Sequence, residues 1–278
     1  MSENTQVIVS TFYKFFDFPC YENISESLKQ FCISQDLKGT ILLASEGLNS
    51  TVSGSREGLD KLYTYLLDEY NIDLDNIKES FCDTRPFGKM KVRLKEEIVT
   101  LRAGNIDVNT TKGEYIEPEA WDEFISRDDV VLIDTRNSYE INLGTFANAV
   151  DPDTKNFRDF PEWLEGNKET LKGKKIAMCC TGGVRCEKST AFMKMEGFEE
   201  VYHLKGGIIN YLEKTANKNK KWHGSLFVFD DRFVLNDKLE QSFDTLCVKC
   251  NNVLTTDDAK RSGKSKILYC KECIKCQV

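Results

Sequence analysis

Two short runs of apolar residues in the middle of the chain constrain the fold most. VVLIDT (130–135) and KKIAMCC (174–180) contain few polar residues, a pattern typical of strands that are buried on both faces of a parallel sheet. Helical patterns follow them at 158–171 and 186–196, and VYHLKGG (201–207) indicates another short strand and turn. This alternation predicts an α/β domain over residues 121–217 with a parallel sheet.

The N-terminal part of the chain predicts a different arrangement. Helical periodicity occurs at 24–35 and again from about 56 to 70, where Ser55 is a suitable N-cap. Strand patterns occur at 7–16, 39–44, 48–54, 77–83 and 89–95. The resulting order β-α-β-β-α-β describes a ferredoxin-like unit. We therefore expect an α+β domain over residues 1–104, joined by a polar linker, residues 105–120, to the α/β domain.

Composition excludes several classes of protein. The 278 residues contain no apolar run long enough to span a membrane and no secretory signal at the N-terminus. A cytoplasmic protein without a membrane partner is therefore expected. In such a protein the 11 cysteines indicate metal ligands or reactive thiols rather than a disulfide framework.

The sequence CCTGGVRCEK (179–188) contains the candidate reactive thiol. It follows a predicted strand and precedes a predicted helix, so backbone N–H groups and the helix N-terminus converge on this loop and favour an anion there. A thiolate at Cys180 would be stabilised by that cradle and by a nearby arginine. The cradle consists of Thr181, Gly182, Gly183, Val184 and Arg185.

Two alternatives remain open because the first two cysteines are adjacent. Counted from Cys180, the loop has six residues, which suits a thiolate that bears one extra sulfur or oxygen. Counted from Cys179, the spacing Cys-x5-Arg is that of cysteine-dependent phosphatases. Adjacent residues of a strand point to opposite faces, so only one cysteine can face the loop. Cys186 is either a resolving thiol for Cys180 or a packing residue.

These motifs resemble a known superfamily. DTRNSYE (134–140), GTFANAV (144–150), the thiol loop and LKGGI (204–208) together look like a rhodanese domain. In that family the catalytic cysteine opens a six-residue loop, a position that maps onto Cys180. Asp134, Arg136 and Glu140 match positions that are mainly architectural.

The resemblance extends over almost the whole chain. Together with the loop, KGTILLASEGLNSTVSG (38–54), KVRLKEEIV (91–99) and FVFDDR (227–232) look like the bacterial rhodanese-containing tRNA uridine hydroxylases. That family implies hydroxylation of the wobble uridine, position 34 in the anticodon loop of tRNA, to 5-hydroxyuridine with molecular oxygen. The loop cysteine is essential there, and no metal or flavin is established. A rhodanese-type sulfurtransferase with a Cys180 persulfide is the alternative.

The C-terminal segment, residues 218–278, predicts a small cysteine-rich module. Cys247–Cys250 and Cys270–Cys273 have the spacing of two zinc knuckles, and Cys276 is an alternative fourth ligand. A zinc ion held by four thiolates would be structural. The alternative is a set of reduced surface thiols.

Basic residues near the C-terminus are candidates for contact with the tRNA backbone. From Lys214 onward the chain has 13 Lys and Arg against 8 Asp and Glu, although its net charge is −7. Phosphates attract lysine, and splayed anticodon bases stack on aromatic rings. The candidates are Lys218, Lys220, Lys221, Trp222, Lys264 and Lys266. The alternating basic residues Lys89, Lys91, Arg93 and Lys95 are either a second contact or an ordinary exposed strand face.

Overall fold

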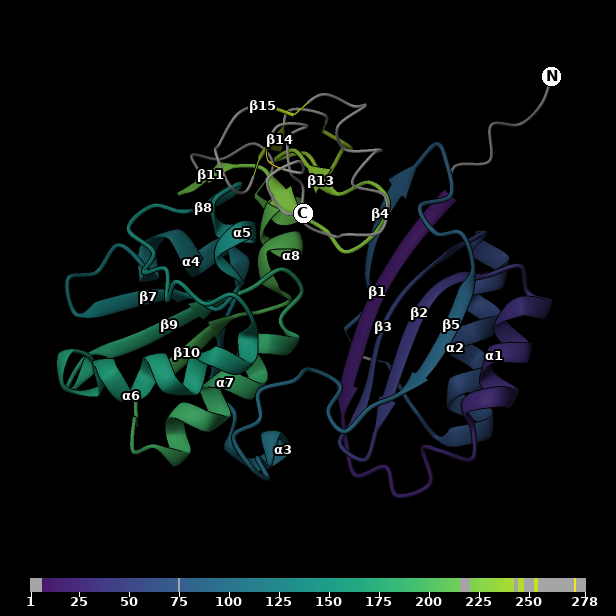
Figure 1. Cartoon of the computed structure of the whole chain (residues 1–278), viewed down its shortest axis with the longest axis horizontal. Helices are drawn as coiled ribbons and strands as arrows, with labels where there is room; N and C mark the ends of the chain where they lie inside the picture. Colours follow the sequence, from purple (N-terminus) through teal and green to yellow (C-terminus); the bar gives the residue numbers. More distant parts are fainter. Residues whose placement is uncertain are drawn as a thin grey trace.

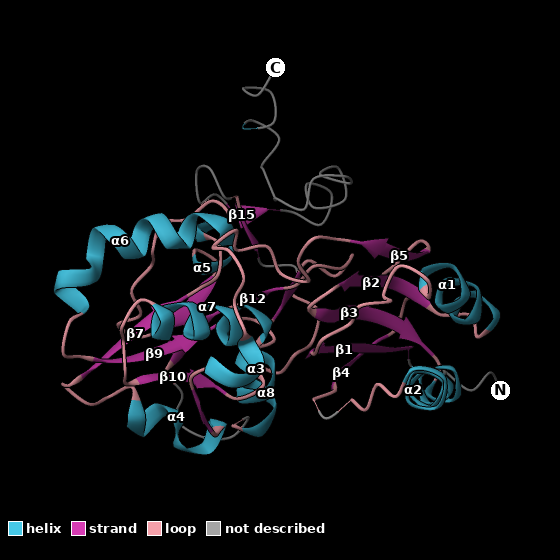
Figure 2. Ribbon diagram, turned by 90° about the horizontal axis from the view of Figure 1, so that it is seen from below, coloured by secondary structure: helices cyan, strands magenta, loops and turns pink. Residues whose placement is uncertain are grey.

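The chain folds into two α/β units that lie side by side (Figure 1). The computed structural model describes residues 7–74, 76–215, 221–242, 245–247, 253–254 and 273. In both views a five-stranded sheet and a four-stranded sheet form the centres of the two units (Figures 1 and 2).

The N-terminal sheet has the strand order β4-β1-β3-β2-β5. Its strands are β1 (Val7–Phe15), β2 (Lys38–Ala44), β3 (Gly47–Gly54), β4 (Lys78–Cys82) and β5 (Met90–Leu94). The first four form the antiparallel order 4-1-3-2 of a ferredoxin-like unit, and β5 pairs in parallel with β2. The predicted α+β domain is therefore confirmed, and the strand predicted at 89–95 is β5, an edge strand added to the ferredoxin-like order.

Two helices cover only one face of this sheet. Helix α1 (Ser25–Ser34) and helix α2 (Arg56–Tyr70) pack Leu28, Leu59 and Leu62 into its apolar core. The Ser55 side chain accepts a 3.1 Å hydrogen bond from the Gly58 N–H, so the predicted N-cap is present. The helix-free face points toward the second unit (Figure 2).

The second sheet is parallel throughout, as the apolar strands predicted. Its order is β6-β10-β9-β7, formed by β6 (Glu114–Ile116), β7 (Val130–Asp134), β9 (Lys175–Cys179) and β10 (Val201–Leu204). Helices α4 (Pro118–Phe124) and α8 (Gly207–Lys214) pack on one face. Helices α6 (Phe160–Leu171) and α7 (Val184–Met195) pack on the other.

The segment expected to be a linker, residues 105–120, is instead largely structured. It contains helix α3 (Val108–Thr111), the edge strand β6 and the start of α4. Strand β6 is only three residues long and has no buried position, so it produces no hydrophobic periodicity. Its place in the sheet depends on pairing with β10, a contact that a local pattern does not reveal.

Shorter elements lie outside these two sheets. They are α5 (Ser138–Ile141), β8 (Gly144–Phe146), the 3-10 helix η1 (Phe157–Asp159), β11 (Trp222–Gly224), β12 (Leu226–Phe227), β13 (Val234–Leu235), β14 (Thr245–Leu246) and β15 (Val253–Leu254). Within the described ranges, no helix has the length and apolarity needed to cross a bilayer.

Candidate active site

The thiol loop lies at the carboxyl end of β9 and leads directly into α7. Gly183 has φ +103°, a left-handed conformation that favours glycine. This bend turns the Gly183 N–H back toward the start of the loop, where it donates a 3.1 Å hydrogen bond to the Cys180 Sγ. The helix begins at Val184, two residues earlier than the sequence predicted, so the positive end of its dipole is close to this sulfur.

Cys180 is a buried thiol that favours its ionised form. Burial alone would raise its pKa, but a hydrogen bond from the Cys186 thiol, the positive charge of Arg185 and the backbone N–H groups of Cys186 and Gly183 together lower the pKa to about 6. Most of the Cys180 side chain would then be thiolate at neutral pH, which is the nucleophilic form. The side chain also lines a cleft between the two units.

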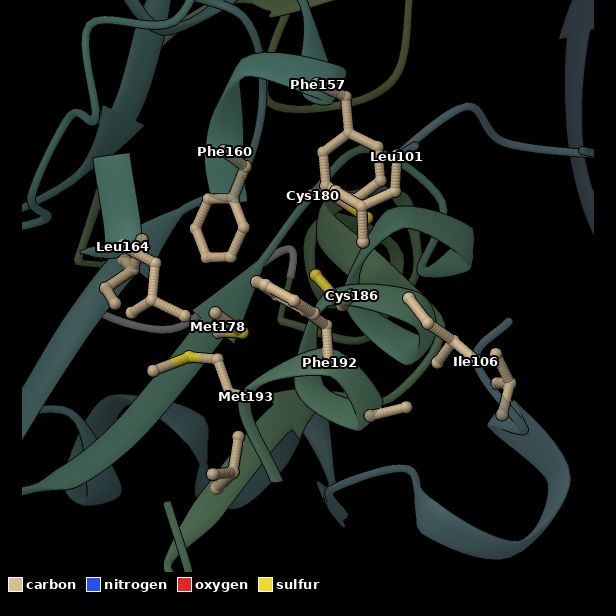
Figure 3. Packing of buried hydrophobic residues seen from close by; sticks show 14 of the residues in the cluster. Leu101, Ile106, Phe157, Phe160, Leu164, Met178, Cys180, Cys186, Phe192 and Met193 are labelled. Atoms are coloured by element: carbon tan, nitrogen blue, oxygen red, sulfur yellow. The ribbon is translucent and has the colours of Figure 1, made fainter. Parts of the chain in front are cut away.

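Cys179 lies on the opposite face of the sheet. It packs with Ala177 and Ile208, whereas Cys180 packs with Met178 and Cys186 (Figure 3). Burial raises the pKa of Cys179 well above its usual value, and the Asp134 carboxylate raises it further. Cys180 is therefore the cysteine that faces the loop, and this geometry favours the loop that opens at Cys180 over the phosphatase-like spacing counted from Cys179.

Cys186 lies in the first turn of α7, next to the thiol loop. It is fully buried and its Sγ is 3.6 Å from the Thr135 Oγ1. Burial raises the pKa of Cys186, and the hydrogen bond to Cys180 raises it further. Figure 3 shows the Cys180 and Cys186 sulfur atoms in one cluster of side chains. Cys186 is therefore a proton donor to the Cys180 thiolate in this arrangement.

Arg185 closes the loop and is held by a carboxylate. Its two terminal nitrogens donate 2.7 and 2.8 Å hydrogen bonds to the two oxygens of Glu140, and one of them also lies 3.2 Å from the Thr181 Oγ1. Arg185 and Glu140 are both buried. This bidentate pair fixes the plane of the guanidinium next to the loop.

A second buried ion pair, Arg136 with Asp134 at 2.6 Å, lies next to the loop region. The Arg136 guanidinium also donates to the Gly144 carbonyl. These contacts agree with the architectural roles that the resemblance implied for Asp134 and Arg136.

Helix α8 supports the loop from the other side. The N–H groups of Ile208 and Ile209 donate to the carbonyls of Cys180 and Thr181, at 2.9 and 3.1 Å. Gly207 has φ +71°, and a Cβ there would be 2.6 Å from the Cys180 carbonyl oxygen. The glycine pair of LKGGI therefore allows this close approach, a role that the sequence motif alone did not identify.

The N-terminal unit contacts the first turn of α7 through two consecutive residues. The Tyr13 hydroxyl donates a 2.7 Å hydrogen bond to the Glu187 Oε1. The Lys188 ammonium lies within 2.8 Å of both Glu46 oxygens and 2.5 Å of a Glu97 oxygen. Glu187 and Lys188 are both buried. They are thus contacts between the two units rather than surface residues of a helix N-terminus.

The cleft next to Cys180 has a volume of about 700 Å³. The helix-free face of the N-terminal sheet forms one wall, and the thiol loop contributes Cys180, Thr181 and Gly182 to another. Among the residues that the structure describes, eight Lys and Arg side chains line this cleft against three Asp and Glu. A basic cleft in an acidic chain provides a local site for a polyanion.

The predicted tRNA contacts occupy different places. Lys91, Arg93 and Lys95 line the cleft, but Lys221 does not. Trp222 is 5% exposed and its ring packs against Phe146 and below the Arg136 guanidinium. The expectation that Trp222 offers a stacking surface is therefore wrong. Lys218, Lys220, Lys264 and Lys266 lie outside the described residues.

The proposed zinc ligands are only partly covered by the structure. Cys247 is buried, and Cys273 packs against the same cluster, which includes Phe227 and Val234. Cys250, Cys270 and Cys276 lie outside the described residues. Within the described part, no three His, Cys, Asp or Glu side chains form a group that could hold a metal ion.

Comparisons with known proteins agree with this architecture. Residues 7–98 match the family described as UPF0176 acylphosphatase like domain, and residues 117–214 match the Rhodanese-like domain. A protein of Wolbachia pipientis subsp. Culex pipiens (strain wPip), named tRNA uridine(34) hydroxylase, is 48% identical over 96% of this chain and 94% of its own length. A protein of the same name from Wolbachia pipientis wMel is also 48% identical, over 96% of both chains.

Proposed function

The chain belongs to the tRNA uridine(34) hydroxylase family, and from this premise we propose that Cys180 is the nucleophile that prepares the wobble uridine for oxidation by molecular oxygen. The protein is a tRNA-modifying oxidoreductase with a rhodanese domain. The observation that supports the role of Cys180 is its position: a thiol with a lowered pKa lines a basic cleft.

The chemistry of uracil explains why a thiolate is useful. C6 of the ring is electrophilic because it is conjugated to the C4 carbonyl. Addition of the Cys180 sulfur to C6 forms an S–C6 bond and moves the C5–C6 π electrons onto C5 and O4. C5 then becomes the electron-rich carbon, and it is the carbon that gains the hydroxyl group in 5-hydroxyuridine. The cradle of N–H groups around Cys180 keeps the sulfur ionised until the base arrives.

The cleft suits single-stranded RNA. Lys91 and Arg93 alternate along β5, Lys95 directly follows the end of this strand, and all three line the cleft. This spacing places three positive charges on one face of an edge strand, where they can follow a phosphate backbone. We propose that the anticodon loop enters here, with the position 34 base next to Cys180.

The role of Cys180 is tested by nucleoside analysis of tRNA. A strain that lacks the gene is complemented with wild-type protein, Cys180→Ser or Cys179→Ala, and 5-hydroxyuridine is quantified by mass spectrometry. We expect no 5-hydroxyuridine with Cys180→Ser and most of the wild-type amount with Cys179→Ala, because Cys179 faces away from the loop. Full modification with Cys180→Ser would refute the proposed role.

The source of oxygen and the alternative activity need separate measurements. Growth under isotopically labelled dioxygen should label the new hydroxyl group, whereas labelled water should not. A rhodanese-type sulfurtransferase would instead transfer sulfur from thiosulfate to cyanide, and deletion of its gene would leave 5-hydroxyuridine unchanged. That pair of results would replace the hydroxylase assignment.

A further inference from the structure

Phe229 is an exposed aromatic residue in an unusual place. Its side chain is 39% exposed and lines the cleft that contains Cys180. Of the large hydrophobic residues that are exposed in the described part of the chain, Phe229 alone lines this cleft. Of the other cleft aromatics, Tyr13 and Phe157 are buried and Phe87 is half-buried. An exposed aromatic ring inside a basic cleft offers an apolar contact surface to a ligand bound there.

Neighbouring aromatic rings hold the Phe229 ring in place. Phe229 packs edge-to-face against Phe227 with ring centroids 5.2 Å apart, and Phe227 packs in the same way against Tyr139. The Val228 N–H donates a 2.9 Å hydrogen bond to the Phe233 carbonyl, which closes the turn that follows Phe229. The ring is therefore placed by rigid neighbours.

The same turn is also bound to the N-terminal unit. Arg232 forms a buried ion pair with Asp230 and donates a 2.8 Å hydrogen bond to the Ser80 Oγ on β4. The Asp231 N–H donates to the Pro86 carbonyl. Phe229 thus lies on a turn that bridges the two units across the cleft, and its position relative to both walls is fixed.

Phe229 is also close to the thiol loop. The Arg185 Cζ lies 5.9 Å from the centre of its ring, and Arg185 is the residue that closes the loop opened by Cys180. A flat pyrimidine that reaches the Cys180 sulfur therefore enters the space next to this ring. Aromatic rings bind single-stranded bases by stacking, which requires a flat exposed face rather than a hydrogen-bond pattern.

We propose that Phe229 stacks on the position 34 uracil and holds it beside Cys180. This inference rests on the proposed function, because it assumes that the ligand of the cleft is anticodon RNA. It replaces Trp222, which is buried, with Phe229 as the aromatic contact of the substrate. Charge complementarity supports this ligand, since Lys91, Arg93 and Lys95 line the same cleft.

Substitutions that separate flatness from volume test the proposal. Phe229→Leu keeps an apolar side chain but removes the flat ring, whereas Phe229→Tyr keeps the ring. We expect Phe229→Leu to weaken binding of an anticodon stem-loop RNA on the order of 10-fold, with a corresponding rise in KM, and Phe229→Tyr to remain close to wild type. Phe81→Leu is the matched control, because Phe81 is 53% exposed but does not line the cleft.

Photochemical cross-linking gives a second readout that does not depend on turnover. An anticodon stem-loop with 5-bromouridine at position 34 is irradiated with the full-length protein, and the cross-linked peptide is sequenced. We expect a cross-link to the peptide that contains Phe229, in addition to any cross-link to the Cys180 peptide, and loss of the Phe229 cross-link in Phe229→Leu.

The outcomes separate the two proposals. If wild-type protein binds the RNA but Phe229→Leu binds and cross-links equally well, or no cross-link to the Phe229 peptide forms, the stacking role is wrong and the function stands. If wild-type protein binds no anticodon RNA and deletion of its gene leaves 5-hydroxyuridine unchanged, both proposals fail.

Discussion

The Tyr13 hydroxyl, on the first strand of the chain, donates a 2.7 Å hydrogen bond to Glu187, on the helix that follows the thiol loop. Tyr115 donates to the same carboxylate oxygen at 2.6 Å. The next residue, Lys188, pairs with Glu46 and Glu97 of the N-terminal part. The N-terminal unit therefore fixes the first turn of α7, and with it the orientation of the loop that contains Cys180.

Removal of the Tyr13 hydroxyl should destabilise the protein. Tyr13→Phe keeps the ring but leaves the buried Glu187 carboxylate with one fewer donor, at a cost of about 1.5–3 kcal/mol for a hydrogen bond to a charged group. The free energy of unfolding from urea titration measures this cost. Tyr65→Phe is the control, because the Tyr65 hydroxyl bonds within the N-terminal unit, to Tyr70 at 3.0 Å. Equal losses in the two variants would contradict the role of the Tyr13 hydroxyl.

The lowered pKa of Cys180 predicts a pH dependence of its reactivity. Because its pKa is about 6, the thiolate fraction should rise as pH increases through 6 and change little above 7. The rate of alkylation by iodoacetamide, followed by mass spectrometry of the Cys180 peptide, should follow this curve, with the exposed Cys20 as an internal reference for the reagent.

Cys186→Ala provides a check on the physical cause of that pKa. It removes the thiol hydrogen bond that stabilises the Cys180 thiolate, so the midpoint of the alkylation curve should move to higher pH. An unchanged midpoint would show that Arg185 and the backbone N–H groups are sufficient to lower the pKa of Cys180 without the Cys186 thiol.

Replacement of Gly183 should disturb the loop because a side chain does not fit there. A Cβ at Gly183 would lie 2.7 Å from the Tyr13 hydroxyl, and its φ of +103° is unfavourable for alanine. Gly183→Ala should therefore cost on the order of 1–3 kcal/mol in unfolding free energy. Gly173→Ala is the matched control, since Gly173 also has a positive φ, +72°, but no atom within 4 Å of the added Cβ.

Removal of the Tyr13 hydroxyl should relieve the clash with a side chain at position 183. In a Tyr13→Phe background the nearest atom to the added Cβ would be the ring carbon, at 3.5 Å. The further loss caused by Gly183→Ala should then be smaller than in wild type. A double-mutant cycle of unfolding free energies measures this coupling, and strict additivity would mean that backbone strain alone explains the effect.

The Lys188 ammonium should be a strong contact between the two units. Its side chain is 2% exposed and pairs with two carboxylates, so Lys188→Met leaves both without their cation and should cost about 3–5 kcal/mol. Lys168→Met is the control, because Lys168 pairs with Glu165 and Glu196 at the surface, where such pairs contribute roughly 0–1 kcal/mol. Similar unfolding free energies for the two variants would contradict the role of Lys188.

Local patterns were sufficient for much of the fold. The apolar strands around 130 and 175 gave the parallel sheet, and Ser55 marked the start of α2 correctly. Strand alternation predicted that only one of Cys179 and Cys180 faces the loop, and the two clusters confirm that alternation. The resemblance to the rhodanese family placed Cys180 there. In these cases the residues that determine the secondary structure are within a few positions of one another in the sequence.

Contacts between distant segments were not accessible to such patterns. Tyr13 and Glu187 are 174 residues apart in the chain, so no periodicity links them. Polar residues such as Glu187 and Lys188 normally face solvent, and here they are buried because the neighbouring unit packs on α7. Trp222 was misjudged for the same reason, since its neighbour Phe146 comes from a strand far away in sequence.

The pairing of β9 has a consequence for the chemistry of the enzyme. Cys179 is paired with Asp134 of β7, and Met178 with His203 of β10. A slip of one residue in this register would turn every side chain of β9 to the other face, and the two adjacent sulfur atoms would exchange places. Pairing with the neighbouring strands therefore determines which of the two thiols faces the loop, and with it the sulfur atom that we propose to react.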